Sequence, residues 1–123
     1  MKPKTAVARA YKELRLQRED RPDGETCWWV FDADNDGQGV FGTEEDGQRH
    51  YEKSVMFRAL ARIDPEYDWH ELDWHTLTGP AGERVDQMVE WRREQEEAAK
   101  EVEGYRALMH LARAAVSSSM RRK

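Results

Sequence analysis

Three aspartates at alternate positions are the residues of this sequence whose types and spacing first suggest a chemistry. Asp32, Asp34 and Asp36 are separated by uncharged residues, and Gly37 follows them. Alternating carboxylates in a turn can bind a hard cation such as Ca²⁺ through their oxygens. Carboxylates this close to one another also repel, so a cation would stabilise them. Asp32, Asp34 and Asp36 are therefore a candidate metal site, with calcium as the candidate ion.

The same segment resembles the first half of an EF-hand calcium loop, but its second half departs from that pattern. The twelfth position of the loop, where a bidentate glutamate is needed, is Thr43, and Glu44 comes one residue late. Gly39 stands where an aliphatic residue is usual, and a strand is expected where the entering helix should be. An ordinary hairpin turn is the favoured interpretation, with a weak calcium site as the alternative.

A second group of potential ligands lies between His70 and His75, together with Glu71 and Asp73. Two histidines that bind one zinc ion from a helix are four residues apart, whereas these are five apart and Trp74 occupies the fourth place. We expect histidines that pack beside tryptophans in an irregular loop, with a metal site as the less favoured alternative.

The sequence gives little support to nucleophilic catalysis. Cys27 lies in an apolar stretch, where a thiol is normally inert, and the serines at 117–119 lack the glycines of a nucleophile elbow. No glycine-rich phosphate loop is present. Because Cys27 is the only cysteine, a disulfide within the chain is excluded, and a reducing, cytoplasmic location is expected. We therefore expect a non-enzymatic protein that uses no cofactor, calcium at the acidic turn excepted.

Charge is unevenly distributed along the 123 residues, whose formal net charge is −5. Residues 1–18 hold six basic side chains against Glu13, whereas residues 19–49 hold ten acidic side chains against two arginines. An acidic centre repels nucleic acid and suits a basic protein partner. Basic residues at the two ends leave a dimeric nucleic-acid-binding regulator as the alternative. The acidic side chains assigned to partner binding are Glu44, Glu45 and Asp46.

Apolar residues are too dispersed for a membrane protein. The longest apolar run, residues 27–31, is far shorter than the roughly 20 residues of a membrane-spanning helix. The basic N-terminal segment also lacks the apolar stretch of a secretory signal. A soluble protein without membrane association is expected.

Hydrophobic periodicity predicts an α+β fold that would place these side chains. We expect a helix over 4–18, a β-hairpin over 26–42, a second helix that ends near residue 63 and a long helix over 80–118. Residues 43–46 resemble the start of the second helix, but Gly47 weakens its first turn, so a regular helix is expected from 43 or only from near Arg49. Residues 66–78 fit either a short third strand or an irregular packed loop. The boundaries predict a compact domain over 1–79 and a C-terminal interaction helix over 80–123.

Both faces of the first hairpin strand are apolar, so alternation alone does not decide which face is buried. Trp29 and Phe31 share one face, and we predict that they pack against Val55, Met56 and Leu60 of the second helix. Trp28 and Val30 would then lie on the other face.

The last helix carries an apolar heptad repeat that is typical of a coiled-coil seam. The seam is apolar at every position except Gln95. A homodimer through this helix is the favoured interpretation, and packing of residues 105–118 on the chain's own first helix is the alternative. The seam residues assigned to partner binding are Val102, Tyr105, Met109, Ala112 and Val116.

The most favoured function is therefore that of a small cytoplasmic protein that binds another protein. Regulators, adaptors and inhibitors fall in this size class, including inhibitors encoded by phages and mobile elements. A nucleic-acid-binding regulator ranks second, and a calcium- or metal-binding module ranks third.

Overall fold

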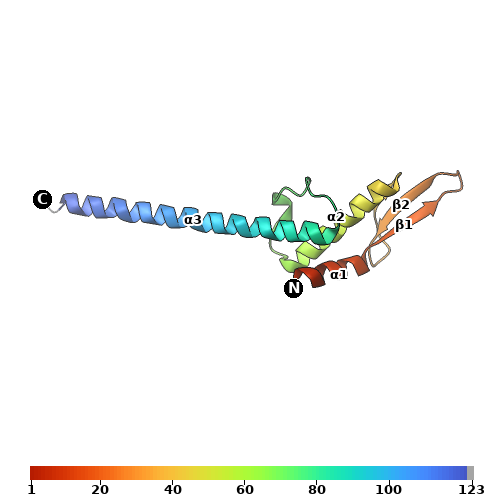
Figure 1. Ribbon diagram of the computed structural model, residues 1–123, viewed down its shortest axis with the longest axis horizontal. Helices are drawn as coiled ribbons and strands as arrows, with labels where there is room; N and C mark the ends of the chain where they lie inside the picture. The colour runs from red at the N-terminus through yellow and green to blue at the C-terminus, as the bar shows by residue number, and fades with distance from the viewer. Residues whose placement is uncertain (122–123) are drawn as a thin grey trace. The chain divides into compact units, whose positions relative to one another are not determined.

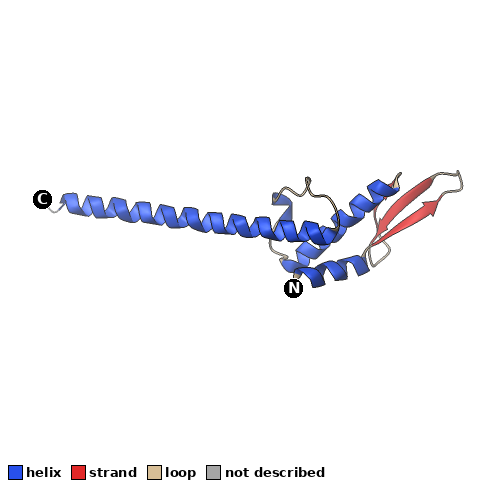
Figure 2. Cartoon of the chain, viewed as in Figure 1, coloured by secondary structure: helices blue, strands red, loops and turns tan. Residues whose placement is uncertain are grey.

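The structure, a computed structural model, describes the backbone of residues 1–121 and the side chains of residues 1–113. It contains helix α1 (Pro3–Glu13), strands β1 (Arg15–Asp20), β2 (Thr26–Phe31) and β3 (Gly37–Phe41), helix α2 (Glu44–Ile63) and helix α3 (Ala81–Arg121). Figure 2 shows the strands as one group at the end of the first unit, next to the helices that precede and follow them in the chain. The predicted α+β class is confirmed.

The chain divides into two compact units, residues 1–89 and residues 90–123. The boundary between them falls within α3, whose 41 residues continue through Gly104. The first unit contains α1, the sheet, α2 and the first part of α3. The second unit consists of the remainder of α3.

The first helix is shorter than predicted, and the residues that follow it form the third strand. Chain geometry becomes extended at Leu14, and Arg15–Asp20 then pairs antiparallel with β2, with Arg15 opposite Phe31 and Asp20 opposite Thr26. The predicted helix over 4–18 is therefore wrong after residue 13. Ladder hydrogen bonds with β2 outweigh the helical preference of this polar segment, because preference is a weak constraint beside tertiary pairing.

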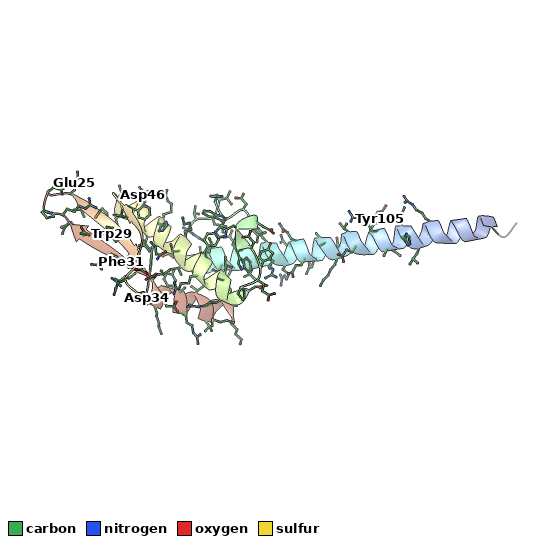
Figure 3. The ribbon with its side chains drawn as sticks, turned by 180° about the vertical axis from the view of Figure 1, so that it is seen from behind. Glu25, Trp29, Phe31, Asp34, Asp46 and Tyr105 are labelled. Carbon is green, nitrogen blue, oxygen red and sulfur yellow. The ribbon has the colours of Figure 1, made fainter. Side chains whose placement is uncertain are left out.

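The sheet has the order β1-β2-β3, and its strands are joined by short connections over 21–25 and 32–36. Gly24 has φ +87° in the first turn, and Asn35 has φ +64° in the second. Figure 3 shows Glu25 and Asp34, which belong to these two turns, at opposite ends of the sheet. The predicted hairpin of β2 and β3 is confirmed, with a register irregularity between Val30 and Phe31.

Helix α2 covers one face of the sheet, and this face is not the predicted one. Val30 is completely buried, and a Cβ atom placed on Gly47 of α2 would lie 2.9 Å from Cβ of Trp28. Trp29 and Phe31 lie on the opposite face and stack on each other with ring centroids 5.6 Å apart. The prediction that Trp29 and Phe31 pack against α2 is therefore wrong, because Gly47 lets α2 approach the face that carries Trp28.

Helix α2 begins at the earlier of its two predicted starts and ends where the local sequence predicts. Thr43 accepts a hydrogen bond from the Asp46 N–H at 3.2 Å through its hydroxyl, and Asp64 ends the helix before Pro65. This helix contacts α1, all three strands and the turn at Trp69–Glu71, and it lies among these elements in Figure 1. The completely buried side chains of the first unit are Ala6, Ala10, Val30, Val55, Met56, Ala59, Leu60, Ala81, Val85 and Met88.

Residues 66–78 form an irregular packed segment rather than a strand. A single 3₁₀ turn covers Trp69–Glu71, and Trp69, Leu72 and Leu77 are buried. The Trp69 indole N–H donates to the Asp64 carbonyl at 3.2 Å. Of the two predicted alternatives for this segment, the packed loop is correct.

Candidate functional site

Large apolar side chains are exposed along one segment of α3. The exposed fraction is 49% for Val102, 65% for Tyr105 and 40% for Met109, which are three of the predicted seam residues. Ala112 is exposed as well, and the side chain of Val116 lies outside the described residues. Leu108 and Leu111, which the seam does not include, are also exposed. Tyr105 is labelled on this segment in Figure 3.

The acidic turn is organised around Asp32. Its Oδ1 accepts the backbone N–H groups of Asp34 at 2.9 Å and Asp36 at 3.0 Å, and its Oδ2 accepts the amide of Gln38 at 3.0 Å. Asp34 and Asp36 are exposed. Among the described side chains, no group of three or more potential ligands is placed to hold a metal ion. The carboxylate of Asp32 therefore stabilises the turn through protein donors, and a cation at this turn stays a hypothesis.

Glu44, Glu45 and Asp46 form the first turn of α2. Carboxylates at a helix N-terminus interact favourably with the helix dipole. Arg49, one turn further on, lies 3.3 Å from Glu45 and 3.8 Å from Asp46. These acids therefore have local partners, and their predicted role in binding another protein stays a prediction.

His70 and His75 belong to an aromatic cluster. The ring of His70 stacks on Phe57 with centroids 4.1 Å apart, and the ring of His75 lies 3.7 Å from that of Trp74. Phe57 and Trp74 meet edge to face at 5.1 Å. This arrangement is the packed loop with histidines beside tryptophans that the sequence favours.

The face of the sheet opposite α2 carries a smaller aromatic surface. Besides the stacked pair of Trp29 and Phe31, the guanidinium carbon of Arg15 lies 4.6 Å from the Phe31 ring centroid. Cys27 is on the same face but is buried. The indole N–H of Trp29 is covered and has no hydrogen-bond acceptor among the described residues.

The basic residues of the predicted first helix are separated by the structure. Lys4, Arg9 and Lys12 are exposed on α1, whereas Arg15 and Arg18 belong to β1. Because side chains alternate along a strand, these two arginines lie on opposite faces of the sheet. The continuous basic helix on which the nucleic-acid alternative depends does not form.

The residues 1–89 also contain a cavity of about 500 Å³ that sequence reasoning missed. It lies where β3, α2, the loop before α3 and the start of α3 meet. Five of its residues can carry positive charge, namely Arg49, His50, Lys53, His75 and Arg84. These five residues are spread over 36 positions of the sequence. Only the recurrence of basic residues along one side of α2 could have predicted part of this group.

Comparison of the chain with protein-family models, with curated proteins and with solved structures finds no match. Within the described part of the chain, no helix is both long enough and apolar enough to cross a membrane. Functional conclusions therefore rest on the side chains of this protein.

Proposed function

We propose that this protein is a non-enzymatic protein-binding protein of the reducing cytoplasm, a regulator, adaptor or inhibitor, and that it binds through the α3 segment from residue 91 onward. The observation that carries this proposal is the exposure of Val102, Tyr105, Leu108 and Met109 within eight residues. An apolar patch of this kind on a helix indicates a surface that another chain covers.

The occupant that the sequence of this segment fits is a second copy of the same helix. Val102, Tyr105, Met109 and Ala112 follow the alternating three- and four-residue spacing of a coiled-coil seam. Ala98 and Ala112 would allow the two helices to approach closely, and the larger side chains between them would fill the interface. Gln95 would restrict the register, as a polar seam residue does at some cost in stability.

The charges beside the seam favour a parallel pair. Glu101 precedes the seam residue Val102, and Arg106 follows the seam residue Tyr105. In a parallel pair, positions of these two kinds face each other between neighbouring heptads, so Glu101 would meet Arg106 of the second copy. An antiparallel pair would instead bring arginine rows together, because Arg92 and Arg113 occupy the same kind of position as Arg106.

Light scattering on the purified chain tests the proposal. We expect the mass of a dimer at micromolar concentration, and the mass of a monomer after Met109→Glu, because a charge at the seam is buried in the pair. Leu111→Glu is the matched control, since Leu111 lies off the seam, and it should remain a dimer. A monomeric mass throughout the micromolar range that Met109→Glu leaves unchanged would contradict self-association.

A further inference from the structure

The cavity of about 500 Å³ in the first unit has the dimensions of a small-molecule site, since such sites range over roughly 300–1,000 Å³. Its wall includes Phe41 from β3 and Lys53 from α2, and it is completed by Trp74 from the packed loop and Arg84 from α3. All four residues belong to the same compact unit. The cavity thus gathers charged and aromatic side chains from segments far apart in the sequence.

Arg84 is the least expected member of this wall. It is only 6% exposed, and its Nε–H donates to the Gly79 carbonyl at 2.8 Å. Among the described residues, no carboxylate forms an ion pair with it. Burying a guanidinium without a counter-charge costs free energy. An anion that binds beside the guanidinium reduces this cost and so stabilises the fold.

Lys53 adds a second positive charge without a carboxylate partner in the described part of the chain. Its ammonium group lies 5.5 Å from the centroid of the Trp74 ring, on which it makes a cation–π contact. Arg49, the third permanent cation of the wall, is already paired with Glu45 and Asp46. Asp46 is the one acidic residue among those that line this cavity. Two positive charges therefore remain to be balanced, in a protein whose overall charge is negative.

The remaining wall is largely aromatic. Trp74 is held by the edge of Phe57 at 5.1 Å and by His75 at 3.7 Å, and Phe41 lies against the ring of His50 at 4.8 Å. Aromatic side chains at the wall of a cavity can contact a planar ring edge to face or face to face. Burial, followed by the nearby charge of Lys53, lowers the pKa of His50, which favours the neutral form of its ring.

We propose that this cavity binds a small phosphate monoester that carries a planar ring. The phosphate group would lie against Arg84 and Lys53, and the ring against Trp74 and Phe41. A phosphate monoester carries up to two negative charges and three acceptor oxygens, which match two unpaired cations better than a single carboxylate does. A nucleoside monophosphate and a simple aryl phosphate share this chemistry. The inference is independent of self-association through α3.

Isothermal titration calorimetry on the full chain tests the ligand class. Adenosine 5′-monophosphate represents the nucleotides, and phenyl phosphate represents the simple aryl phosphates. Adenosine, which lacks the phosphate, and inorganic phosphate, which lacks the ring, are the two half-ligands. We expect one ring phosphate or both to bind one per chain with Kd below about 1 mM, and both half-ligands to bind at least about tenfold more weakly. Which ring phosphate binds more tightly identifies the source. Absence of binding by both, or equal binding of inorganic phosphate, would overturn the proposal.

Two variants locate the site. Lys53→Gln and Arg84→Met each remove one unpaired charge, and each should weaken ring-phosphate binding by about tenfold or more. If circular dichroism shows that Arg84→Met does not fold, Lys53→Gln decides alone, since Lys53 is only half-buried. Lys12→Gln makes the same charge change on exposed α1 and should bind as the unchanged protein does. Binding that survives Lys53→Gln undiminished would overturn this placement of the phosphate.

Discussion

At the scale of single residues, Gly47 decides how the helix and the sheet meet. It is buried in α2, where a Cβ atom would lie 2.9 Å from Cβ of Trp28 and 3.2 Å from Cδ1 of Leu16. The Cβ atom of Trp28 cannot move far, because it is attached to the backbone of the central strand. The missing side chain at Gly47 therefore allows α2 to lie directly on Trp28 and Val30.

Gly47→Ala is expected to destabilise the protein although alanine is the better helix former. The helix gains roughly 1 kcal/mol of intrinsic preference, but overpacking costs about 1–3 kcal/mol, so a net loss of about 1 kcal/mol should appear in urea unfolding. Gly104→Ala is the control, because nothing lies within 4 Å of a Cβ atom at that helical position. It should raise helicity or leave stability unchanged. A stabilised Gly47→Ala would mean that α2 does not approach Trp28 closely.

Glu13 is the residue that ties the end of α1 to α2. Its carboxylate accepts from Arg58 at 2.6 Å and also forms an ion pair with Arg62, and the hydrogen bond from Arg62 is the largest cause that lowers the pKa of Glu13. A carboxyl group whose pKa is lower in the folded state stabilises the fold above its ordinary pKa, and this contribution is lost as the pH falls.

We therefore expect Glu13→Gln to cost about 1 kcal/mol of unfolding free energy at pH 7. The difference from the unchanged protein should shrink as the pH falls below the ordinary glutamate value of 4.5. Glu25→Gln, at an exposed carboxylate in the turn between β1 and β2, provides the control and should change little. A Glu13→Gln difference that is the same at pH 3 and pH 7 would argue against the ion pairs.

At the scale of elements, one polar network joins α1, α2 and the start of α3. The Tyr11 hydroxyl donates to Oε2 of Glu52, and the Ala81 N–H donates to the same oxygen at 2.8 Å. The Tyr51 hydroxyl donates to the Leu14 carbonyl at 3.2 Å, where α1 ends. The network thus satisfies backbone groups at two helix ends, which would otherwise lack partners. Burial, followed by the bond to Glu52, raises the pKa of Tyr11 to about 12.

Tyr11→Phe should lower the unfolding free energy by about 1 kcal/mol at pH 7, because it removes one hydrogen bond from a partly buried carboxylate. A tyrosine whose pKa is raised in the folded state contributes stability that is lost as the pH rises from 10 towards 12. The deficit of Tyr11→Phe, measured by denaturant unfolding, should therefore shrink over that range. A deficit that is the same at pH 8 and at pH 12 would contradict the network.

Which elements could be predicted from the sequence depends on where their stabilisation originates. α2 carries its own stop at Asp64 and Pro65, so its end was predictable, whereas Gly47 left its start open between the cap at Thr43 and the turn near Arg49. β1 was not, because Leu16 is its only half-buried side chain and the strand exists through pairing with β2. The cavity was not predictable either, since Arg84 is indistinguishable from a surface arginine in the sequence. Its burial depends on the loop that ends at Gly79.

At the scale of the whole molecule, acidic and basic side chains are concentrated in different places, which the net charge of −5 does not reveal. Asp32 stabilises a turn, and Glu45 and Asp46 pair with Arg49 at the start of α2. The acidic centre of the sequence therefore has substantial local roles, while Lys53 and Arg84 face a cavity without described carboxylate partners. The two described features on which the binding proposals rest are thus a cationic cavity in residues 1–89 and an exposed apolar helical surface in residues 90–113.

The orientation of the paired helices gives the last prediction. Ala98→Cys places a thiol on the seam, and in a parallel pair the two copies of that position face each other at a distance that a disulfide can span. Mild oxidation should then link Ala98→Cys chains into covalent dimers on a non-reducing gel. The unchanged protein is the control and should stay unlinked, because its single thiol, Cys27, is buried. If the pair were antiparallel, Ala98→Cys alone would not link, and only its mixture with a variant at the other kind of seam position, such as Met109→Cys, would form linked heterodimers. That result would contradict the pairing of Glu101 with Arg106.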